Sequence, residues 1–538
     1  MPNVQLKPGE APPPDYYRTN LIDVCGYVLN AHRSVLEEDD LRWLAALRDA
    51  GVPAQRLFAR LVMRKGPLFR TDKLAYTEID DMALAIQSLV AGGLAERNAR
   101  APADQVLALL LKAELGTLTA ARGRKEDLVA DVLSRLSDEQ IRQRLAGRLC
   151  WLRLAGLETL RKVELLYFGR SHRDLAEFVL RDLGLVRYEE VPHQPDLAPF
   201  ADLPSLTELQ RLRRLQKVAG VLESRAELAP WVLRATLENR APFKGNRHIE
   251  RVRNTLLNSL GRWGERNGAR GFALACYRQS DRHPARERMV RLLVRGAVPD
   301  SAETLLREIH QAPFCREERV FAERFGKRNA GYQPAVTVSE LPDPDMEMTP
   351  GAIERVALAV LARDGSRGMH VENTLPLGLC GLAYWPAIFA PVPGAFSNPM
   401  QSGPNDLFWE DFAAPRATLI DRCTAALRER PERLLETWRE KQGLACGLVH
   451  WAVFSEATVE LLVRSVPAEQ LAALARYTVE HLYSVRTGFP DLFVVHADGA
   501  YEFVEVKGPN DALQPQQRAW FETLEQLGLP ARVLKFRA

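Results

Sequence analysis

Three charged side chains near the end of the chain have types and spacing that suit metal-assisted hydrolysis of a phosphodiester. Asp491 follows a proline, and Glu505 and Lys507 lie two residues apart in a β-rich segment. Residues two apart in a strand share one face, so the carboxylate and the ammonium project side by side. Two converging carboxylates can bind Mg²⁺ through oxygen and leave positions for water and phosphate. Lys507 would then orient or activate the attacking water, or neutralise charge on phosphorus.

The register of a hairpin decides whether the two acids meet. Two β-rich runs on either side of Asp498-Gly499 predict a hairpin. Asp491 faces Glu505 if the loop comprises Ala497 to Gly499, with its glycine in the left-handed conformation. A two-residue loop would pair Asp491 with Val506 and place the two acids on opposite faces. We predict the three-residue loop or an equivalent bulge. For Glu-x-Lys alone, the alternative is a surface hairpin with an ordinary ion pair.

The sequence around these residues is similar to the VRR-NUC branch of the PD-(D/E)xK nucleases. The matching residues are Pro490-Asp491, Glu505-Val506-Lys507-Gly508-Pro509-Asn510-Asp511, Leu513, and Gln517 to Trp520. With Arg486-Thr-Gly-Phe in front, the segment more closely resembles the Fanconi-anaemia-associated nuclease family. Three upstream parts resemble that family's DNA-binding start, its SAP-type helix pair and its TPR-like layer. They are Val62 to Arg70 with Lys73 to Tyr76, Arg124 to Val129, and Ala275 to Arg288.

The resemblance implies further site residues. It places a fourth catalytic glutamate at a helix start upstream, a position that Glu372 fits, because an apolar segment from Leu375 to Ile388 follows it. A clamp of two metal ions needs ligands beyond Asp491 and Glu505, and the candidates are the carbonyl of Val506 and the Glu372 carboxylate. Gln517 is carried over by the motif as a catalytic residue. Without the resemblance, Glu372 is an ordinary helix entrance and Gln517 a surface helix residue.

The family implies a structure-selective, divalent-metal-dependent DNA nuclease that uses Mg²⁺ or Mn²⁺, with two ions in each site. Its implied activities are 5′ flap endonuclease and 5′-to-3′ exonuclease on branched or flapped DNA, in the repair of interstrand cross-links. Two alternatives stay open: a non-catalytic DNA-binding helical-repeat scaffold with a degenerate nuclease domain, and a metallohydrolase of small phosphate esters. The intact Asp491, Glu505 and Lys507 argue against the scaffold.

The start of the chain bears on source and partners. Eukaryotic members carry an N-terminal ubiquitin-binding zinc finger, whereas here Tyr16-Tyr17-Arg18 already resembles the DNA-binding start. We therefore expect a bacterial member that does not bind ubiquitin. Its expected location is cytoplasmic and nucleoid-associated, or nuclear if the source is eukaryotic.

Basic side chains in the first part of the chain are candidates for contacts with DNA phosphates. Arg56, Arg60 and Arg64 are four apart, so they form one stripe if the segment is helical. A second candidate is the helix that begins near Arg124-Lys125, because a helix start offers free N–H groups and a positive dipole end. The predicted DNA-binding residues are Arg60, Arg64, Lys65, Arg70, Lys73, Arg124 and Lys125. A solvated, purely structural face is the alternative for each group.

Hydrophobic periodicity predicts an α-helical first two thirds. The resemblance implies that an α/β PD-(D/E)xK nuclease domain follows it, and that the helical part contains SAP-like and TPR-like regions. The expected parts are a helical DNA-binding domain (1–100), a SAP-like helix pair (101–150), a helical TPR-like region (151–335) and a VRR-NUC nuclease domain (336–538). The proline-rich segment 330–351 is the expected linker. The uncharged stretch from Asn373 to Asn405 approaches the length of a membrane span, but its prolines favour a buried helix that breaks at Pro386.

Composition limits the remaining classes. A chain of 538 residues contains about three or four folded units. The 72 Lys and Arg against 69 Asp and Glu mean that affinity for an anionic partner must come from local patches. The seven cysteines are far apart and contain no CxxC pair, which argues against a zinc finger and a disulfide framework.

Overall fold

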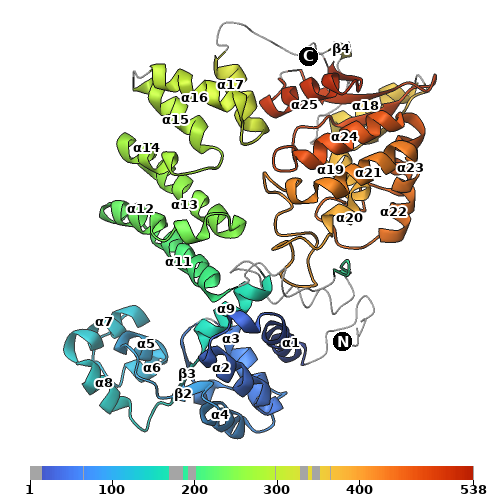
Figure 1. Cartoon of the computed structure of the whole chain (residues 1–538). Coiled ribbons are helices and arrows are strands. Elements are labelled where there is room, and N and C mark those ends of the chain that lie inside the picture. The colour runs from blue at the N-terminus through green and yellow to red at the C-terminus, as the bar shows by residue number, and fades with distance from the viewer. Residues whose placement is uncertain are drawn as a thin grey trace. The chain divides into compact units, whose positions relative to one another are not determined.

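The protein is described by a computed structural model. It describes residues 15–64, 66–168, 186–191, 202–296, 299–326, 337–341, 352–363, 365–509 and 511–536. The chain divides into two compact units, residues 1–186 and 187–538. The second unit contains the predicted nuclease domain and the helical region before it (Figure 1).

The first unit is mainly helical, as predicted, but it also contains a small antiparallel sheet that the sequence pattern did not reveal. Strand β3 (Trp151–Leu154) pairs with both β1 (Leu68–Arg70) and β2 (Ala95–Arg97). The helices of this unit are α1 (Tyr16–Ala31), α2 (Glu38–Asp49), α3 (Val52–Val62), α4 (Met82–Ala91), α5 (Ala103–Ala108), α6 (Lys112–Leu115), α7 (Lys125–Arg135), α8 (Asp138–Leu145) and α9 (Leu157–Phe168). Strands of three or four residues are too short to show a clear alternation.

A stack of helices opens the second unit (Figure 1). They are α11 (Leu203–Ala219), α12 (Ala229–Leu237), α13 (Arg247–Arg266), α14 (Arg270–Arg278), α15 (Ala285–Arg295), α16 (Pro299–Gln311) and α17 (Arg316–Gly326). In α13, Ile249, Leu256, Leu260 and Trp263 recur at helical spacing and are buried. The Asn246 side chain caps this helix by accepting a hydrogen bond from the Ile249 N–H.

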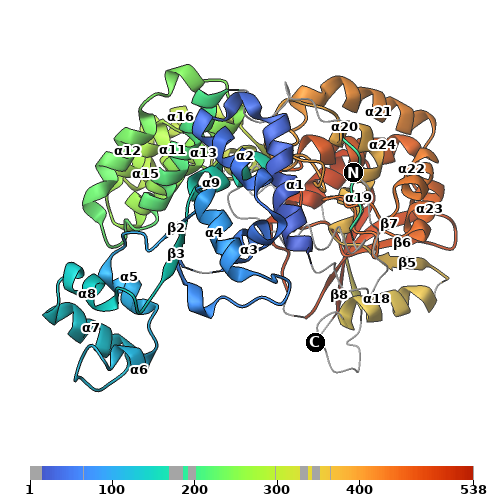
Figure 2. The ribbon, with the colours of Figure 1, turned by 90° about the horizontal axis from the view of Figure 1, so that it is seen from below.

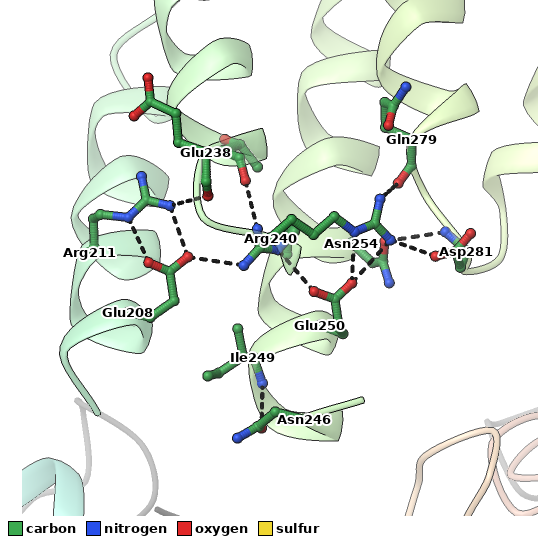
Figure 3. A network of polar contacts seen from close by, with 12 residues as sticks. Glu208, Arg211, Glu238, Arg240, Asn246, Ile249, Glu250, Asn254, Gln279 and Asp281 are labelled. Carbon is green, nitrogen blue, oxygen red and sulfur yellow. Dashed lines mark hydrogen bonds and ion pairs between the residues drawn. The ribbon is translucent and has the colours of Figure 1, made fainter. Parts of the chain in front are cut away.

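Ion pairs between these helices account for much of their basic content. Arg253 of α13 is fully buried and donates to Glu208 of α11 at 3.0 Å. Glu208 also accepts two hydrogen bonds from Arg211, and Arg240 pairs with Glu250 (Figure 3). Buried charges need such partners. These arginines therefore hold the helices together and are not a free phosphate-binding surface.

The predicted nuclease domain is built on a mixed five-stranded sheet with the order β4-β8-β7-β6-β5. The strands are β4 (Thr337–Leu341), β5 (Arg367–His370), β6 (Leu492–Val495), β7 (Tyr501–Lys507) and β8 (Ala531–Phe536). Apolar residues of α18 (Ala352–Arg363) pack on the face formed by Val504 and Val506. Phe493 and Phe503, on the other face, join the core of the remaining helices (Figure 2). Those helices are α19 (Thr374–Ala383), α20 (Trp385–Ile388), α21 (Ala417–Glu429), α22 (Arg433–Lys441), α23 (Glu456–Ser465), α24 (Ala468–Glu480) and α25 (Pro515–Gln526).

The uncharged stretch is domain core. It forms α19 and α20, and the helix breaks at Tyr384, two residues before the expected break at Pro386. Leu375, Leu379 and Ile388 are completely buried against the rest of the domain. No helix among the described residues is long and apolar enough to cross a membrane.

Two strands of this sheet differ from the expectation. The proline-rich segment 330–351 was expected to be a linker, yet its residues 337–341 form β4, parallel to β8. The rest of that segment, residues 330–336 and 342–351, lies outside the described residues. Strand β5 pairs antiparallel with β6 where no strand was expected. Both strands depend on partners far away in the sequence, and local periodicity does not contain that information.

Candidate active site

The hairpin has the predicted register. Leu492 lies opposite Val504, and Val495 lies opposite Tyr501. Extending that pairing by one residue places Asp491 opposite Glu505. Gly499 has a φ of +88°, as expected for the left-handed position in the loop. The prediction of a three-residue loop that brings the two acids to one end of the hairpin is therefore confirmed.

Glu505 is at the centre of the cluster and is 1% exposed. Its Oε1 accepts from the Lys507 ammonium at 2.9 Å and from the Gln517 side-chain amide at 2.5 Å. Its Oε2 is buried and has no hydrogen-bond partner. The Asp491 Oδ2 accepts from the Val506 N–H at 2.8 Å. The structure thus brings Asp491, Glu505, Lys507 and Gln517 together.

Gln517 reaches Glu505 because of how α25 begins. Pro515 occupies the first turn of the helix, where its missing N–H costs nothing. The Gln514 N–H donates to Gln517 Oε1 at 2.8 Å, which leaves the Gln517 NH₂ group free to face the sheet. One end of this side chain thus caps the helix while the other donates to the buried carboxylate.

The carboxylates of Asp491 and Glu505 repel each other when both are negatively charged. Burial, together with the neighbouring acids, raises the pKa of Asp491 to about 6. Burial and the Asp491 charge raise the pKa of Glu505 to about 7, although Lys507 opposes the shift. Near neutral pH, this pair therefore holds a proton unless a cation takes its place.

Glu372 lies at the edge of this cluster. The N–H groups of Val371 and Glu372 both donate to the backbone carbonyl of Asp491, at 2.8 and 3.1 Å. These two hydrogen bonds hold the segment that leads into α19 against the backbone of Asp491. Glu372 has a φ of +39°, a conformation that is strained for a residue with a side chain. Its carboxylate is 3.2 Å from His370 Nε2 and its side chain is 48% exposed. The Glu372 side chain makes no hydrogen bond to Asp491 or Glu505, but its charge raises the pKa of both.

Glu354 is a further acid at the site that was not predicted from the sequence. It lies in the first turn of α18, and its charge also raises the pKa of Asp491. One of its carboxylate oxygens, Oε2, is buried without a hydrogen-bond partner. Nothing in the sequence singled it out, because a glutamate in the first turn of a helix is common.

The chemistry of these groups fits a divalent cation. Among the described residues, no three His, Cys, Asp or Glu side chains already form a metal-binding group. However, Glu505 and Glu354 each keep a buried carboxylate oxygen without a partner, and a buried lone pair of this kind is costly. Oxygen atoms of clustered carboxylates are the ligands that Mg²⁺ and Mn²⁺ prefer. The carbonyl of Val506 stays a predicted ligand.

The arginine stripe of the first unit is largely neutralised. Arg56 and Arg60 lie on α3, but Arg56 pairs with Asp15 and Arg60 with Glu78 at 2.6 Å. Arg64 follows the end of the helix, is exposed, and donates to the Tyr76 hydroxyl at 3.1 Å. The stripe was expected to be free because its partner acids are distant in the sequence. Lys65 lies outside the described residues.

The other predicted DNA-binding residues differ in their exposure. Arg70 is 9% exposed and donates to both oxygens of Asp72 and to Glu114. This placement indicates a structural role for Arg70, and its contact with DNA stays a prediction. Lys73 is 56% exposed, and its ammonium is 4.0 Å from Asp72. Arg124 is the exposed N-cap of α7, whereas Lys125 bonds the Ala108 carbonyl.

Comparison with known proteins identifies the family. The VRR-NUC domain model matches residues 428–538, and the model described as FAN1, HTH domain matches residues 15–96. The Fanconi-associated nuclease 1 homolog of Pseudomonas aeruginosa is 32% identical over 98% of this chain and 96% of its own length. The chain belongs to the Fanconi-associated nuclease family. The Fanconi-associated nuclease 1 homolog of Oryza sativa is 24% identical over 96% of this chain and 62% of its own length.

Solved structures agree with this assignment. A crystal structure of paFAN1 bound to 2nt 5′ flap DNA with a gap matches with a TM-score of 0.80 and 29% identity, over 98% of this chain and 99% of that one. A second, bound to 1nt 5′ flap DNA with a gap, gives a TM-score of 0.79 and 30% identity. These findings confirm the predicted family, the helical region followed by a VRR-NUC domain, and a structure-specific DNA nuclease that depends on divalent metal. Similarity to the Pseudomonas protein also fits the expected bacterial member.

Proposed function

We propose that this nuclease cuts branched or flapped DNA as a 5′ flap endonuclease and a 5′-to-3′ exonuclease, using Mg²⁺ or Mn²⁺ at the Asp491–Glu505 site. The observation that carries the proposal is Glu505. It is a buried carboxylate with one oxygen bonded to Lys507 and Gln517 and the other without a partner. Such a group suits cation binding better than a purely structural ion pair, in which both oxygens would be satisfied.

Asp491 and Glu505 would hold the metal ions, with Glu372, the Val506 carbonyl and Glu354 as further candidate ligands. The ions supply Lewis acidity and a nucleophilic water at neutral pH. Lys507, 2.9 Å from Glu505, adds a positive charge beside the reacting phosphate and orients the attacking water. Gln517 restrains the Glu505 carboxylate by donating to Oε1, so that Oε2 faces the site.

The polarity and the biological role rest on the relatives. The paFAN1 structures hold DNA with a 5′ flap, and their similarity extends over almost the whole of this chain. We infer that the same kind of junction is the substrate here, and that the enzyme acts in the repair of interstrand cross-links. A cytoplasmic, nucleoid-associated location is part of the same proposal.

The first unit would hold the duplex. Arg64, Lys73 and Arg124 are exposed and are the strongest of the predicted phosphate contacts, and Lys65 remains in the set. Arg60 and Lys125 are weaker members because each is already bonded within the protein. The bounds of the four predicted domains remain part of the proposal.

A cleavage assay with duplexes that carry a 5′ flap, a 3′ flap or no flap tests the proposal. The strand with the flap is labelled at either end, and reactions contain Mg²⁺, Mn²⁺ or a chelator. We expect metal-dependent incision near the junction of the 5′ flap, followed by shortening from the 5′ side. Equal cleavage of the 3′ flap would contradict the polarity. Binding without cleavage under all conditions would favour the non-catalytic scaffold.

A further inference from the structure

The nuclease domain and the helical stack are joined at a position close to the active site. Arg316, the first residue of α17, reaches α25 across the boundary between them. Its Nη2 donates to the Ala519 carbonyl at 2.6 Å and to the Thr523 hydroxyl at 2.9 Å. Hydrogen bonds from a charged donor are shorter and stronger than neutral ones, so this contact restrains one turn of α25.

The Arg316 guanidinium also lies near two aromatic rings, at 5.5 Å from the centre of Tyr477 and 5.6 Å from that of Trp520. Trp520 is fully buried and donates from Nε1 to the Thr487 carbonyl at 3.2 Å. Its ring meets Phe489 edge to face at 5.0 Å. Arg316 therefore contacts the same tryptophan that packs against the segment leading into Asp491.

An active-site residue lies directly before the restrained turn. Gln517 lies two positions before Ala519 on α25, and its amide donates to Glu505. A shift of this turn would move the amide away from Glu505, and a displacement of about 1 Å can lower a rate by about a hundredfold. Gln517 itself has no contact with α17 among the hydrogen bonds of the described residues.

We propose that Arg316 is a positioning residue: from the helical stack, it fixes α25 so that Gln517 restrains Glu505. This inference rests on the proposed function. It gives the helical stack a part in catalysis besides any part in holding DNA. Arginine suits the position because Nη2 donates to both acceptors while the flat guanidinium lies near two aromatic rings, and the compact ammonium of lysine has no such flat face.

A matched control lies on the same two helices. Arg324 of α17 is 3.6 Å from Glu522 of α25, and its side chain is 43% exposed. This pair is longer than a hydrogen bond and is open to solvent, so it contributes little. Arg324→Ala removes the same charge from the same helix without loosening the turn that carries Gln517.

The test compares single-turnover cleavage of a 5′ flap duplex with affinity for that duplex in Ca²⁺. We expect Arg316→Ala to slow cleavage by about tenfold or more with affinity within twofold of wild type, Arg316→Lys to recover part of the rate, and Arg324→Ala to cleave normally. A cleavage rate of Arg316→Ala equal to that of wild type would overturn the inference but not the proposed function. A wild-type protein without metal-dependent cleavage would overturn both.

Two outcomes would assign Arg316 another role. Arg316 lines a cavity of about 550 Å³ with Arg291 and Arg324, so a loss of affinity at an unchanged rate would make it a DNA contact and overturn the inference. The double variant with Gln517→Ala distinguishes positioning from general destabilisation. If Arg316 acts through Gln517, its replacement costs little further rate in that background. Full additivity of the two losses would contradict the proposal.

Discussion

At the scale of single residues, Glu505 and Asp491 determine what the site can do. Replacing Asp491, Glu505 or Lys507 by alanine should lower cleavage by about a hundredfold or more, because each supplies charge at the reacting phosphate. Affinity for DNA in Ca²⁺ should stay within about twofold, since binding rests on phosphate contacts elsewhere. Glu525→Gln, which removes an exposed acid of α25, is the control and should cleave normally. Near wild-type cleavage by any of the three variants would show that its residue has another role.

The raised pKa values of the two acids predict how stability depends on pH. Both carboxyls have a higher pKa in the folded protein than the value of about 4 expected when unfolded, so the folded state binds more protons between about pH 4 and pH 7. In a chelator, the pair should therefore reduce the free energy of unfolding as pH rises through this window.

The double variant Asp491→Asn/Glu505→Gln isolates this effect from other titrating groups. In thermal unfolding with chelator, it should be more stable than wild type at pH 8, and the difference should shrink towards pH 5. Added Mg²⁺ should stabilise wild type but not the variant at pH 8. A difference between the two proteins that does not change with pH would mean that burial does not raise these pKa values.

Glu354 gives a prediction at a residue that no motif identified. Its charge acts on Asp491 and one of its carboxylate oxygens is buried without a partner, so Glu354→Gln should raise the metal concentration needed for half-maximal cleavage by about tenfold. DNA affinity in Ca²⁺ should not change. A metal titration curve that superimposes on the wild-type curve would assign Glu354 to the fold alone.

The sequence revealed those site residues that local chemistry distinguishes. Asp491, Glu505 and Lys507 could be predicted because they lie on one hairpin, where strand alternation and loop length fix their relative places. Gln517 and Glu372 needed the family resemblance, since each alone resembles an ordinary helix residue. Glu354 could not be predicted, because its proximity to Asp491 depends on the packing of α18 against the sheet.

At the scale of elements, Gly488 packs closely against the first turn of α25. Gly488 has a φ of +91°, and a Cβ there would lie 2.8 Å from the backbone carbon of Gln516. Gly488→Ala should therefore destabilise the domain by more than backbone strain alone, and it should slow cleavage because it displaces the residue next to Gln517. Thermal unfolding and the flap assay measure the two effects.

Gly499 is the matched control for this prediction. It has a similar φ of +88°, but a Cβ there would meet nothing within 4 Å. Gly499→Ala should cost only about 1–2 kcal/mol of backbone strain and leave cleavage unchanged. Equal losses of stability and activity in the two variants would contradict the close approach of Gly488 to α25.

The elements that the sequence failed to predict share one property. The hairpin of β6 and β7 was predicted with its register because its partners are adjacent in the chain. Strands β4 and β5 pair with segments far along the sequence, and β1, β2 and β3 are too short for a clear period. Long-range pairing of short strands leaves little local signal.

At the scale of the whole molecule, binding to DNA should rest on exposed cations and not on the total basic content. Many arginines of the helical regions are paired with acids, as Arg253 is with Glu208 and Arg60 with Glu78. The residue types could be read from the sequence, but their partners come from other elements. Exposed fraction, not sequence spacing, therefore selects the candidates.

Replacing Arg64, Lys73 and Arg124 together by alanine should weaken binding to all duplexes and reduce the slope of log K against log salt by about one unit for each lost phosphate contact. Fluorescence anisotropy at several salt concentrations measures the slope. Arg161→Ala, an exposed cation that pairs with Glu158 in its own helix, is the control. A slope equal to that of wild type would mean that these three residues form a solvated face.

The sharpest test of a metal site at Glu505 is the single-turnover rate of 5′ flap cleavage as Mn²⁺ or Mg²⁺ is titrated, for wild type and Glu505→Gln side by side. The substitution keeps the size of the side chain and removes its negative charge. We predict no cleavage in chelator, a saturable rise in the wild-type rate with metal, and at least a hundredfold lower rate for the variant at every metal concentration. Cleavage by wild type in chelator, or equal rates for the two proteins at saturating metal, would contradict a metal-dependent nuclease centred on Glu505.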